Sequence, residues 1–174
     1  MTTRIKEGSL ELAFDAPAHR LDDPGRARPE GMKLVDIVVE QDVRILLVEI
    51  KNPSSPEIPK AHRASQRADF AKKIRGRELI AHDLVPKARD SYCFLHLMRQ
   101  DKKPMIFVVL LGLSAYPDEA ALLLGFKDHL LKRLRQETDQ PWARRYVQDC
   151  VVLTEEQWSG VFPEYRLRRV PGAS

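Results

Sequence analysis

The sequence predicts an α/β fold in which a mixed β-sheet carries helices on both faces, formed by a single domain over residues 1–174. Three observations predict it. Short apolar runs bounded by turn residues are typical of strands, and three of them come early in the chain. Longer segments with helical spacing then alternate with single apolar runs. The composition, 43% hydrophobic and 31% charged over 174 residues, is that of an ordinary globular domain.

The first part of the predicted sheet is a meander of three strands. Residues 9–15, SLELAFD, alternate apolar with polar or small side chains, which indicates a half-buried strand. The proline- and glycine-containing stretch 16–31 is predicted to be a loop. Residues 31–40 and 43–51 are then two strands, and Gln41-Asp42 is expected to form a two-residue turn between them.

The second part of the chain supplies the helices. The rigid, proline-rich loop NPSSPEIP leads into a basic helix, in which Gly76 is an unfavourable residue for the second half. Asp118 is suited to cap a later helix, and Thr154 with Gln157 has the spacing of a capping box. The predicted helices cover 60–83, 84–100, 118–136 and a short segment after Thr154, and the predicted strands cover 103–113, 148–153 and 165–170.

Several classes of protein are disfavoured. No apolar run approaches the roughly 20 residues of a membrane-spanning helix. The start of the chain, MTTRIKEGSLE, has no signal-peptide core, so a cytoplasmic protein without a membrane partner is expected. Cys93 and Cys150 are expected to be reduced core residues, and the five histidines lack the spacing of a zinc site. Nucleotide-binding loops and a GxSxG nucleophile elbow are absent from the sequence.

Positive charge is concentrated in one part of the chain. Residues 60–103 contain twelve Lys or Arg and five Asp or Glu, a local balance of +7. The whole chain has a net charge of +4, so the remainder sums to −3. A basic segment of this kind suits a polyanionic partner, although a solvated helix face explains the charge equally well.

The most hydrophobic ribbon of the sequence, VDIVVEQDVRILLVEIKN, contains three unexpected charges, Asp36, Glu49 and Lys51. A buried charge is unfavourable unless it is paired or binds a metal ion. With a two-residue turn, Asp36 lies opposite Leu47, and side chains alternate between faces along each strand. Asp36, Glu49 and Lys51 are therefore predicted to project from one face, with the two carboxylates close enough to share one divalent cation.

Two carboxylates and a lysine on one face suit phosphodiester hydrolysis. Mg²⁺ prefers carboxylate oxygens, keeps several waters and offsets charge that develops on a phosphate. A lysine beside the attacking water orients it and stabilises the same charge. The alternative is structural: Glu49 and Lys51 form a partly exposed ion pair near a strand end, while loop donors satisfy Asp36.

These residues resemble the PD-(D/E)XK nuclease superfamily. Asp36, followed by Glu49-Ile50-Lys51 in a hydrophobic strand, matches its motif, and the resemblance covers roughly residues 10–113. Val35 stands where many members have proline. The resemblance implies a restriction-endonuclease-like fold and an Mg²⁺- or Mn²⁺-dependent nuclease acting on DNA, in prokaryotic defence, repair or mobile-element biology. It also implies that Asp36, Glu49 and the Ile50 carbonyl bind the metal and that Lys51 positions the water.

Further site residues follow from the same resemblance. An exonuclease-like branch carries a glutamine and an aromatic residue four apart on the next helix, and Gln66 with Phe70 matches that spacing. An additional carboxylate is often present before the meander. The candidates are Asp22 and Asp23 in the loop, each of which also suits a solvated turn, and Glu11.

The basic segment supplies the expected contacts with DNA. The residues expected to hold the phosphate backbone are Arg63, Arg67, Lys72, Lys73 and Arg75. The run 87–90 offers phosphate contacts too, or is a solvated helix start. The alternative function is a catalytically inactive nuclease-fold module that binds nucleic acid or a protein partner in a larger assembly. A protein partner or a homodimer is left open.

Overall fold

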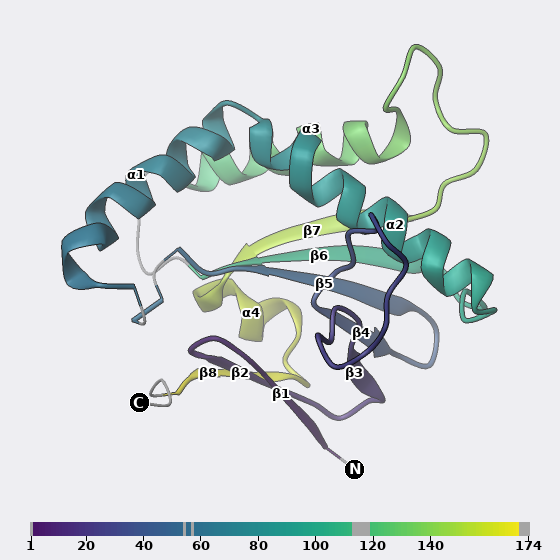
Figure 1. Cartoon of the computed structure of the whole chain (residues 1–174), viewed down its shortest axis with the longest axis horizontal. Coiled ribbons are helices and arrows are strands. Elements are labelled where there is room, and N and C mark those ends of the chain that lie inside the picture. Colours follow the sequence, from purple (N-terminus) through teal and green to yellow (C-terminus); the bar gives the residue numbers. More distant parts are fainter. Residues whose placement is uncertain (1, 54, 57, 113–118, 171–174) are drawn as a thin grey trace.

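A five-stranded mixed sheet forms the centre of the molecule (Figure 1). The computed structural model describes residues 2–53, 55–56, 58–112 and 119–170. The strand order is β3-β4-β5-β6-β7. The strands are β3 (Ala18–Arg20), β4 (Ile37–Glu40), β5 (Ile45–Lys51), β6 (Met105–Leu111) and β7 (Asp149–Thr154). The β3–β4 and β4–β5 pairs are antiparallel, whereas β5–β6 and β6–β7 are parallel, so the predicted mixed α/β sheet is confirmed.

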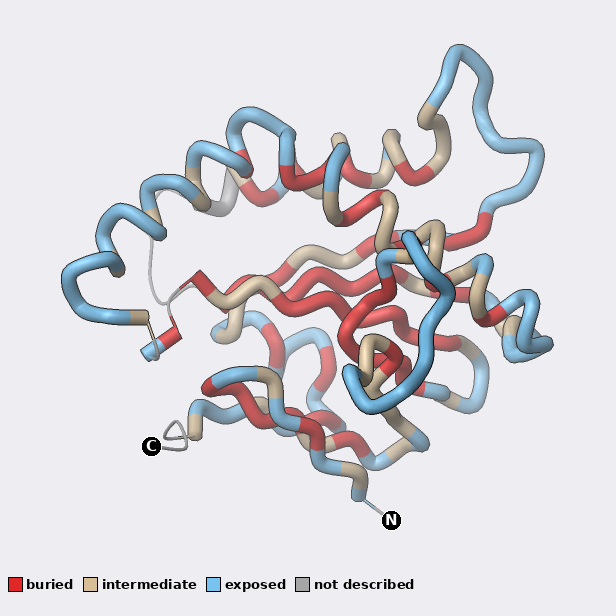
Figure 2. Tube along the Cα trace, in the orientation of Figure 1, coloured by how far each residue is buried: buried red, intermediate tan, exposed pale blue. Residues whose placement is uncertain are grey.

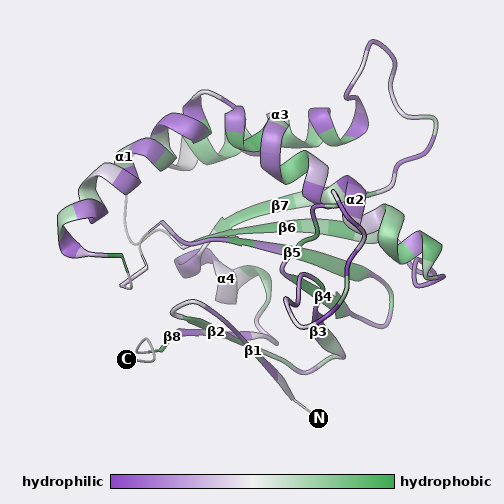
Figure 3. Ribbon diagram, in the orientation of Figure 1, coloured by the Kyte–Doolittle hydropathy of each residue, from purple (hydrophilic) through white to green (hydrophobic). Residues whose placement is uncertain are grey.

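Three helices cover one face of this sheet: α1 (Lys60–Arg75), α2 (Val85–Leu97) and α3 (Glu119–Arg135) (Figure 1). The side chains of Leu47, Phe107 and Leu130 are fully buried between the sheet and the helices. The central strands are apolar and buried along most of their length, as buried parallel strands require (Figures 2 and 3). Asp118, the expected cap of α3, lies outside the described residues.

The other face of the sheet is covered mainly by strands. A second sheet, of order β1-β2-β8, lies there beside the short helix α4 (Figure 1). The elements are β1 (Thr3–Glu7), β2 (Leu10–Phe14), β8 (Arg166–Arg169) and α4 (Glu155–Val161). Phe14 and Trp158 are buried in a core between the two sheets. The prediction of helices on both faces therefore holds on this side for α4 alone within the described residues. β1 was missed, and the predicted strand 9–15 is β2 of this second sheet, so its place in the meander of the main sheet was wrong.

Two local predictions can be judged directly. The capping box of Thr154 and Gln157 is confirmed at the start of α4. The predicted loop 16–31 is partly wrong, because β3 within it adds three residues to the sheet edge beside β4. Such a short edge strand leaves almost no pattern in the sequence.

The predicted basic helix 60–83 is in fact two elements. α1 ends at Arg75, and Arg77 then adopts a left-handed conformation with φ of 62°. The π-helical turn η1 (Ile80–Leu84) follows and leads directly into α2. η1 was not predicted from the sequence.

Pro86 explains the π-helical turn. A proline has no N–H, so it cannot donate to the carbonyl four residues earlier, which is that of His82. Lys33 donates to this carbonyl oxygen instead, with an Nζ–O distance of 2.7 Å. The Val85 N–H, just before Pro86, donates to the carbonyl of Ile80 five residues earlier. In an α-helix it would donate to the carbonyl four residues earlier. Turns of this kind are frequent at functional sites.

Within the described residues, none of the helices is both long enough and apolar enough to cross a membrane.

Candidate functional site

The β4–β5 hairpin sets the position of the central charges. Glu40 pairs with Ile45, so the connection has four residues, 41–44, and the predicted two-residue turn is wrong. This shifts the register by two residues and brings Asp36, which just precedes β4, opposite Glu49 instead of Leu47. A shift by an even number leaves each side chain on its predicted face. Asp36 and Glu49 are therefore closer neighbours than the sequence suggested.

Asp36 is buried at the start of the hairpin, with 5% of its surface exposed. Its Oδ2 accepts a hydrogen bond from the Ile50 N–H at 2.6 Å. Burial, reinforced by the nearby Glu49 charge, raises the pKa of Asp36 to about 8, although Lys87 and the Ile50 N–H favour the ionised form. The positive charge of Lys87 near Asp36 therefore does not offset the effect of burial and of the Glu49 charge on this pKa.

Glu49 is fully buried on β5, between the sheet and the helices. Its Oε1 lies 2.7 Å from Lys51 Nζ and 2.6 Å from Lys87 Nζ. Its Oε2 is also buried and has no hydrogen-bond partner among the described residues. Burial raises the pKa of Glu49, and the two lysines oppose this effect. A buried carboxylate oxygen without a partner calls for an explanation, and a bound ion, a water molecule or a catalytic role can each provide one.

Lys51 joins this centre to the π-helical turn. Its Nζ lies 2.5 Å from Asp83 Oδ2 as well as beside Glu49, and 20% of its side chain is exposed. Burial lowers the pKa of Lys51, but the charges of Glu49 and Asp83 outweigh burial and raise it. Lys51 is therefore a positively charged group between two carboxylates.

Lys87 belongs to this centre, although the sequence did not predict it next to the carboxylates. Its Nζ lies 3.7 Å from Asp36 Oδ1, in addition to its contact with Glu49. The sequence signal was weak: Lys87 comes four residues after Asp83, which puts the two on one helical face. The three carboxylates of Asp36, Glu49 and Asp83 thus surround two ammonium groups, leaving one negative charge in excess when all are ionised.

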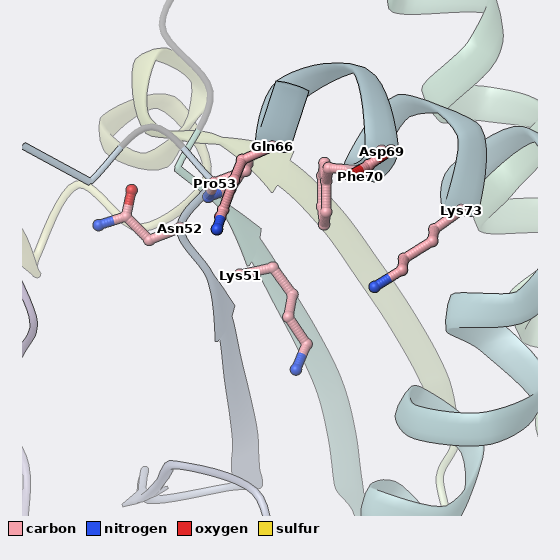
Figure 4. Close-up of a pocket in the computed structure, with 7 residues that line it drawn as sticks. All are labelled: Lys51, Asn52, Pro53, Gln66, Asp69, Phe70 and Lys73. Carbon is pink, nitrogen blue, oxygen red and sulfur yellow. The ribbon is translucent and has the colours of Figure 1, made fainter. Parts of the chain in front are cut away.

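A pocket of about 280 Å³ opens beside Lys51 under α1. Gln66 and Lys73 line it from the helix, and Phe70 also packs against the helix-side core. Figure 4 shows Phe70 and Lys73 projecting from α1 toward the strand that carries Lys51. The structure therefore places the predicted Gln66 next to Lys51, and not next to the buried carboxylates.

A second groove, of about 590 Å³, lies on the other side of the centre, and Asp22, Asp83 and Lys87 line it. Asp22 Oδ1 pairs there with Arg20 at 3.1 Å. It borders the site without a described contact to Asp36 or Glu49.

The other candidate carboxylates lie in local structures. Asp23 accepts the Gly25 N–H at 2.8 Å, which is a turn interaction. Glu11 pairs with Arg168 across the second sheet. Neither residue is brought to the Asp36–Glu49 pair by the described contacts.

The basic residues of α1 differ in their surroundings. Arg63 is engaged by the preceding loop, since it donates to the carbonyls of Ile58 at 2.9 Å and Pro56 at 2.8 Å. Arg67 is partly buried. Of the five residues expected to contact DNA, the exposed ones are Lys72, Lys73 and Arg75. These last three are best placed to meet a polyanion.

The centre has some of the features of a divalent-metal site. Among the described residues, no three acidic, histidine or cysteine side chains converge to hold an ion. Asp36 and Glu49 nevertheless provide two facing carboxylates, and the unpartnered Glu49 Oε2 fits a cation that prefers oxygen ligands. Mg²⁺ keeps several waters and needs only one or two carboxylates. The carboxylates of Asp36 and Glu49, together with the Ile50 carbonyl, are therefore ligands of the type that Mg²⁺ requires.

Gly112 supports the strand end that carries Lys51. Its N–H donates to the Lys51 carbonyl at 2.7 Å, and a Cβ on it would lie 2.5 Å from Asn52 Oδ1. Asn52 cannot move freely, because its amide donates to Ser9 at 3.2 Å. We expect Gly112→Ala to lower the free energy of unfolding in urea by about 1–3 kcal/mol, as overpacking does.

The matched control for this change is Gly125→Ala on α3, where an added Cβ meets nothing within 4 Å. It should raise the free energy of unfolding by about 0.5–1 kcal/mol, since alanine favours a helix. Equal effects of the two substitutions would contradict a close contact at Gly112.

Comparisons of the chain with protein-family models, with curated proteins and with solved structures each give no match.

Proposed function

We propose that the protein is a metal-dependent phosphodiester hydrolase that acts on DNA, with its centre at Asp36, Glu49 and Lys51. The observation that carries this proposal is the pair of facing, buried carboxylates with one oxygen unpartnered and a lysine adjacent. Purely structural buried charges are usually paired and fully hydrogen-bonded. The resemblance of Asp36, Glu49, Ile50 and Lys51 to the PD-(D/E)XK motif points to the same chemistry.

Each residue then has a distinct role. Asp36, Glu49 and the Ile50 carbonyl would hold Mg²⁺ or Mn²⁺, which when bound lowers the pKa of a water and offsets phosphate charge. Lys51 orients the attacking water and stabilises negative charge on the phosphate. Asp83 holds the Lys51 ammonium in place through their ion pair. Gln66, in the pocket next to Lys51, positions the scissile phosphate.

The positive charge on α1 indicates the class of substrate. Lys73 faces the pocket beside Lys51, and Lys72 and Arg75 extend the positive charge along the exposed helix (Figure 4). A phosphate backbone crossing α1 would pass the reactive centre. Contacts of this kind bind the backbone without reading the bases.

The test is a cleavage assay. The purified protein is incubated with supercoiled plasmid and with single-stranded DNA, with Mg²⁺, with Mn²⁺ and with a chelator. We expect metal-dependent cleavage that is absent from Glu49→Gln. Cleavage that survives in Glu49→Gln, or that ignores the chelator, would reject the proposed centre.

A second function is favoured by one observation. The ammonium groups of Lys51 and Lys87 already pair with the buried carboxylates, so the centre is largely neutralised without a metal ion. Such a network suits a nuclease-fold module that binds nucleic acid or a protein partner without cutting. DNA binding without metal-dependent cleavage in the same assay would support it.

Neutralising α1 should weaken DNA binding. We expect the double substitution Lys72→Ala with Lys73→Ala to weaken binding about equally for all sequences and to reduce the salt slope by about 1 for each lost contact. Fluorescence anisotropy over a series of salt concentrations measures both effects. The control is Arg144→Ala with Arg145→Ala, an exposed basic pair between α3 and β7. Equal losses from both doubles would show that only the overall charge matters.

A further inference from the structure

The Lys87 ammonium occupies a special place in the proposed centre. It contacts one oxygen of each buried carboxylate, Glu49 Oε1 at 2.6 Å and Asp36 Oδ1 at 3.7 Å. Lys51, the other ammonium, contacts Glu49 and is shared with Asp83. Among the described residues, Lys87 therefore provides the ammonium group that contacts both facing carboxylates.

We propose that Lys87 is an internal counter-ion that holds the place of the divalent cation between Asp36 and Glu49, so that metal binding requires its ammonium to leave. This inference rests on the proposed function. Two positive charges next to the same pair of carboxylates repel each other strongly where the surroundings exclude water. The occupied state neutralises the carboxylates when metal is absent and makes metal binding weaker than the carboxylates alone would allow.

The groove on the other side of the centre gives Lys87 room to move. Lys87 itself lines this groove of about 590 Å³, together with Asp22 and Asp83. A displaced ammonium would thus enter a polar space whose walls carry three carboxylates, those of Asp22, Glu30 and Asp83, and also the cations Arg28 and Lys33. The long side chain of Lys87 allows the rotation. Glu49 lacks this freedom because it is fully buried, and its Oε2 has no hydrogen-bond partner among the described residues.

The experiment measures Mn²⁺ binding in the absence of DNA, by calorimetry and by electron paramagnetic resonance. We expect Lys87→Met to bind Mn²⁺ about tenfold more tightly than the parent or better, because the competing charge is gone. Lys87→Gln, which keeps a donor for Glu49 without the charge, should behave in the same way if the methionine variant fails to fold. Asp36→Asn should lose most of the binding.

The matched control is Lys33→Met. Lys33 lines the same groove, but its Nζ donates to the His82 carbonyl and not to a carboxylate. Its removal should leave Mn²⁺ affinity within about twofold of the parent. An equal gain in Lys33→Met and Lys87→Met would overturn the proposal, because general charge would then explain the effect.

Melting temperatures provide a second readout. Without metal, Lys87→Met should melt below the parent, since Glu49 loses a counter-ion, and Mn²⁺ should raise its melting temperature more than the parent's.

Two other results are decisive. If Lys87→Met and Lys87→Gln bind Mn²⁺ no better than the parent while Asp36→Asn loses binding, the counter-ion role is overturned and the proposed metal centre stands. If the parent and both Lys87 variants all fail to bind Mn²⁺, the metal centre and the counter-ion role fail together.

Discussion

Asp36→Asn is expected to abolish cleavage and, without metal, to raise the melting temperature at pH 8 by about 5 °C or more. The pKa of Asp36 is raised from 3.8 to about 8, so the folded protein binds this proton more tightly than the unfolded chain does. The free energy of unfolding of the parent therefore falls as pH rises from about 4 to about 8 and changes no further above that range. Asparagine removes the ionisable group and keeps an oxygen for the Ile50 N–H, so part of this fall should disappear.

Thermal unfolding of the parent and the variant between pH 4 and pH 9 checks this result. Asp42→Asn, the same chemical change at an exposed position of the β4–β5 connection, should leave the pH profile as it is in the parent. If the variant is less stable than the parent at pH 8 and Mg²⁺ leaves the melting temperature of the parent unchanged, Asp36 is a structural anion, and the nuclease proposal fails.

Lys51→Ala is expected to lower the turnover of DNA by about 10²-fold or more, the scale of losing one positioned electrostatic group. Folding should survive, because Lys87 remains beside Glu49. The loss of stability should nevertheless exceed the roughly 1 kcal/mol of an exposed ion pair, since the Lys51 side chain is 20% exposed and has two carboxylate partners.

Asp83→Asn distinguishes a role of Lys51 in catalysis from a role in holding the structure. It removes one partner of the Lys51 ammonium and leaves the contact with Glu49 intact. If Lys51 acts on the water, Asp83→Asn should cost much less activity than Lys51→Ala. If the two variants lose the same activity in step with the same stability, the role of Lys51 is to hold Asp83 and the π-helical turn.

The parts of the fold with a strong periodic pattern were predictable. The apolar runs of β5, β6 and β7 and the spacing of α2 gave their existence and type. The edges were harder to predict, because β1 has a single apolar residue, Ile5, and the sequence therefore shows no apolar–polar alternation there. Helices were expected on both faces because the strands predicted at 9–15 and 165–170 were assigned to a single sheet, whereas they form a second sheet with β1 that covers one face.

The carboxylate pair was predictable and its register was not. Val43 favours strands, so the sequence placed it in β5, whereas the protein exposes 75% of its surface in the hairpin connection. Asp36 lies on its predicted face of the sheet only because the error in the strand register was an even number of residues, two. Lys87 was missed because the predicted helices were divided between residues 83 and 84, whereas η1 runs directly into α2 and joins Asp83 and Lys87 in one continuous helical segment.

The weak attachment of α1 has a consequence for its local unfolding. Of its 16 residues only Ile74, near the carboxyl end, is fully buried (Figure 2). A helix of this length is marginal in water by itself, so α1 opens at a cost far below that of unfolding the sheet. Its amide hydrogens are therefore expected to exchange with solvent long before those of β5. If the proposed DNA substrate binds along α1, it should favour the closed form and slow this exchange, which would couple substrate binding to the order of the pocket beside Lys51.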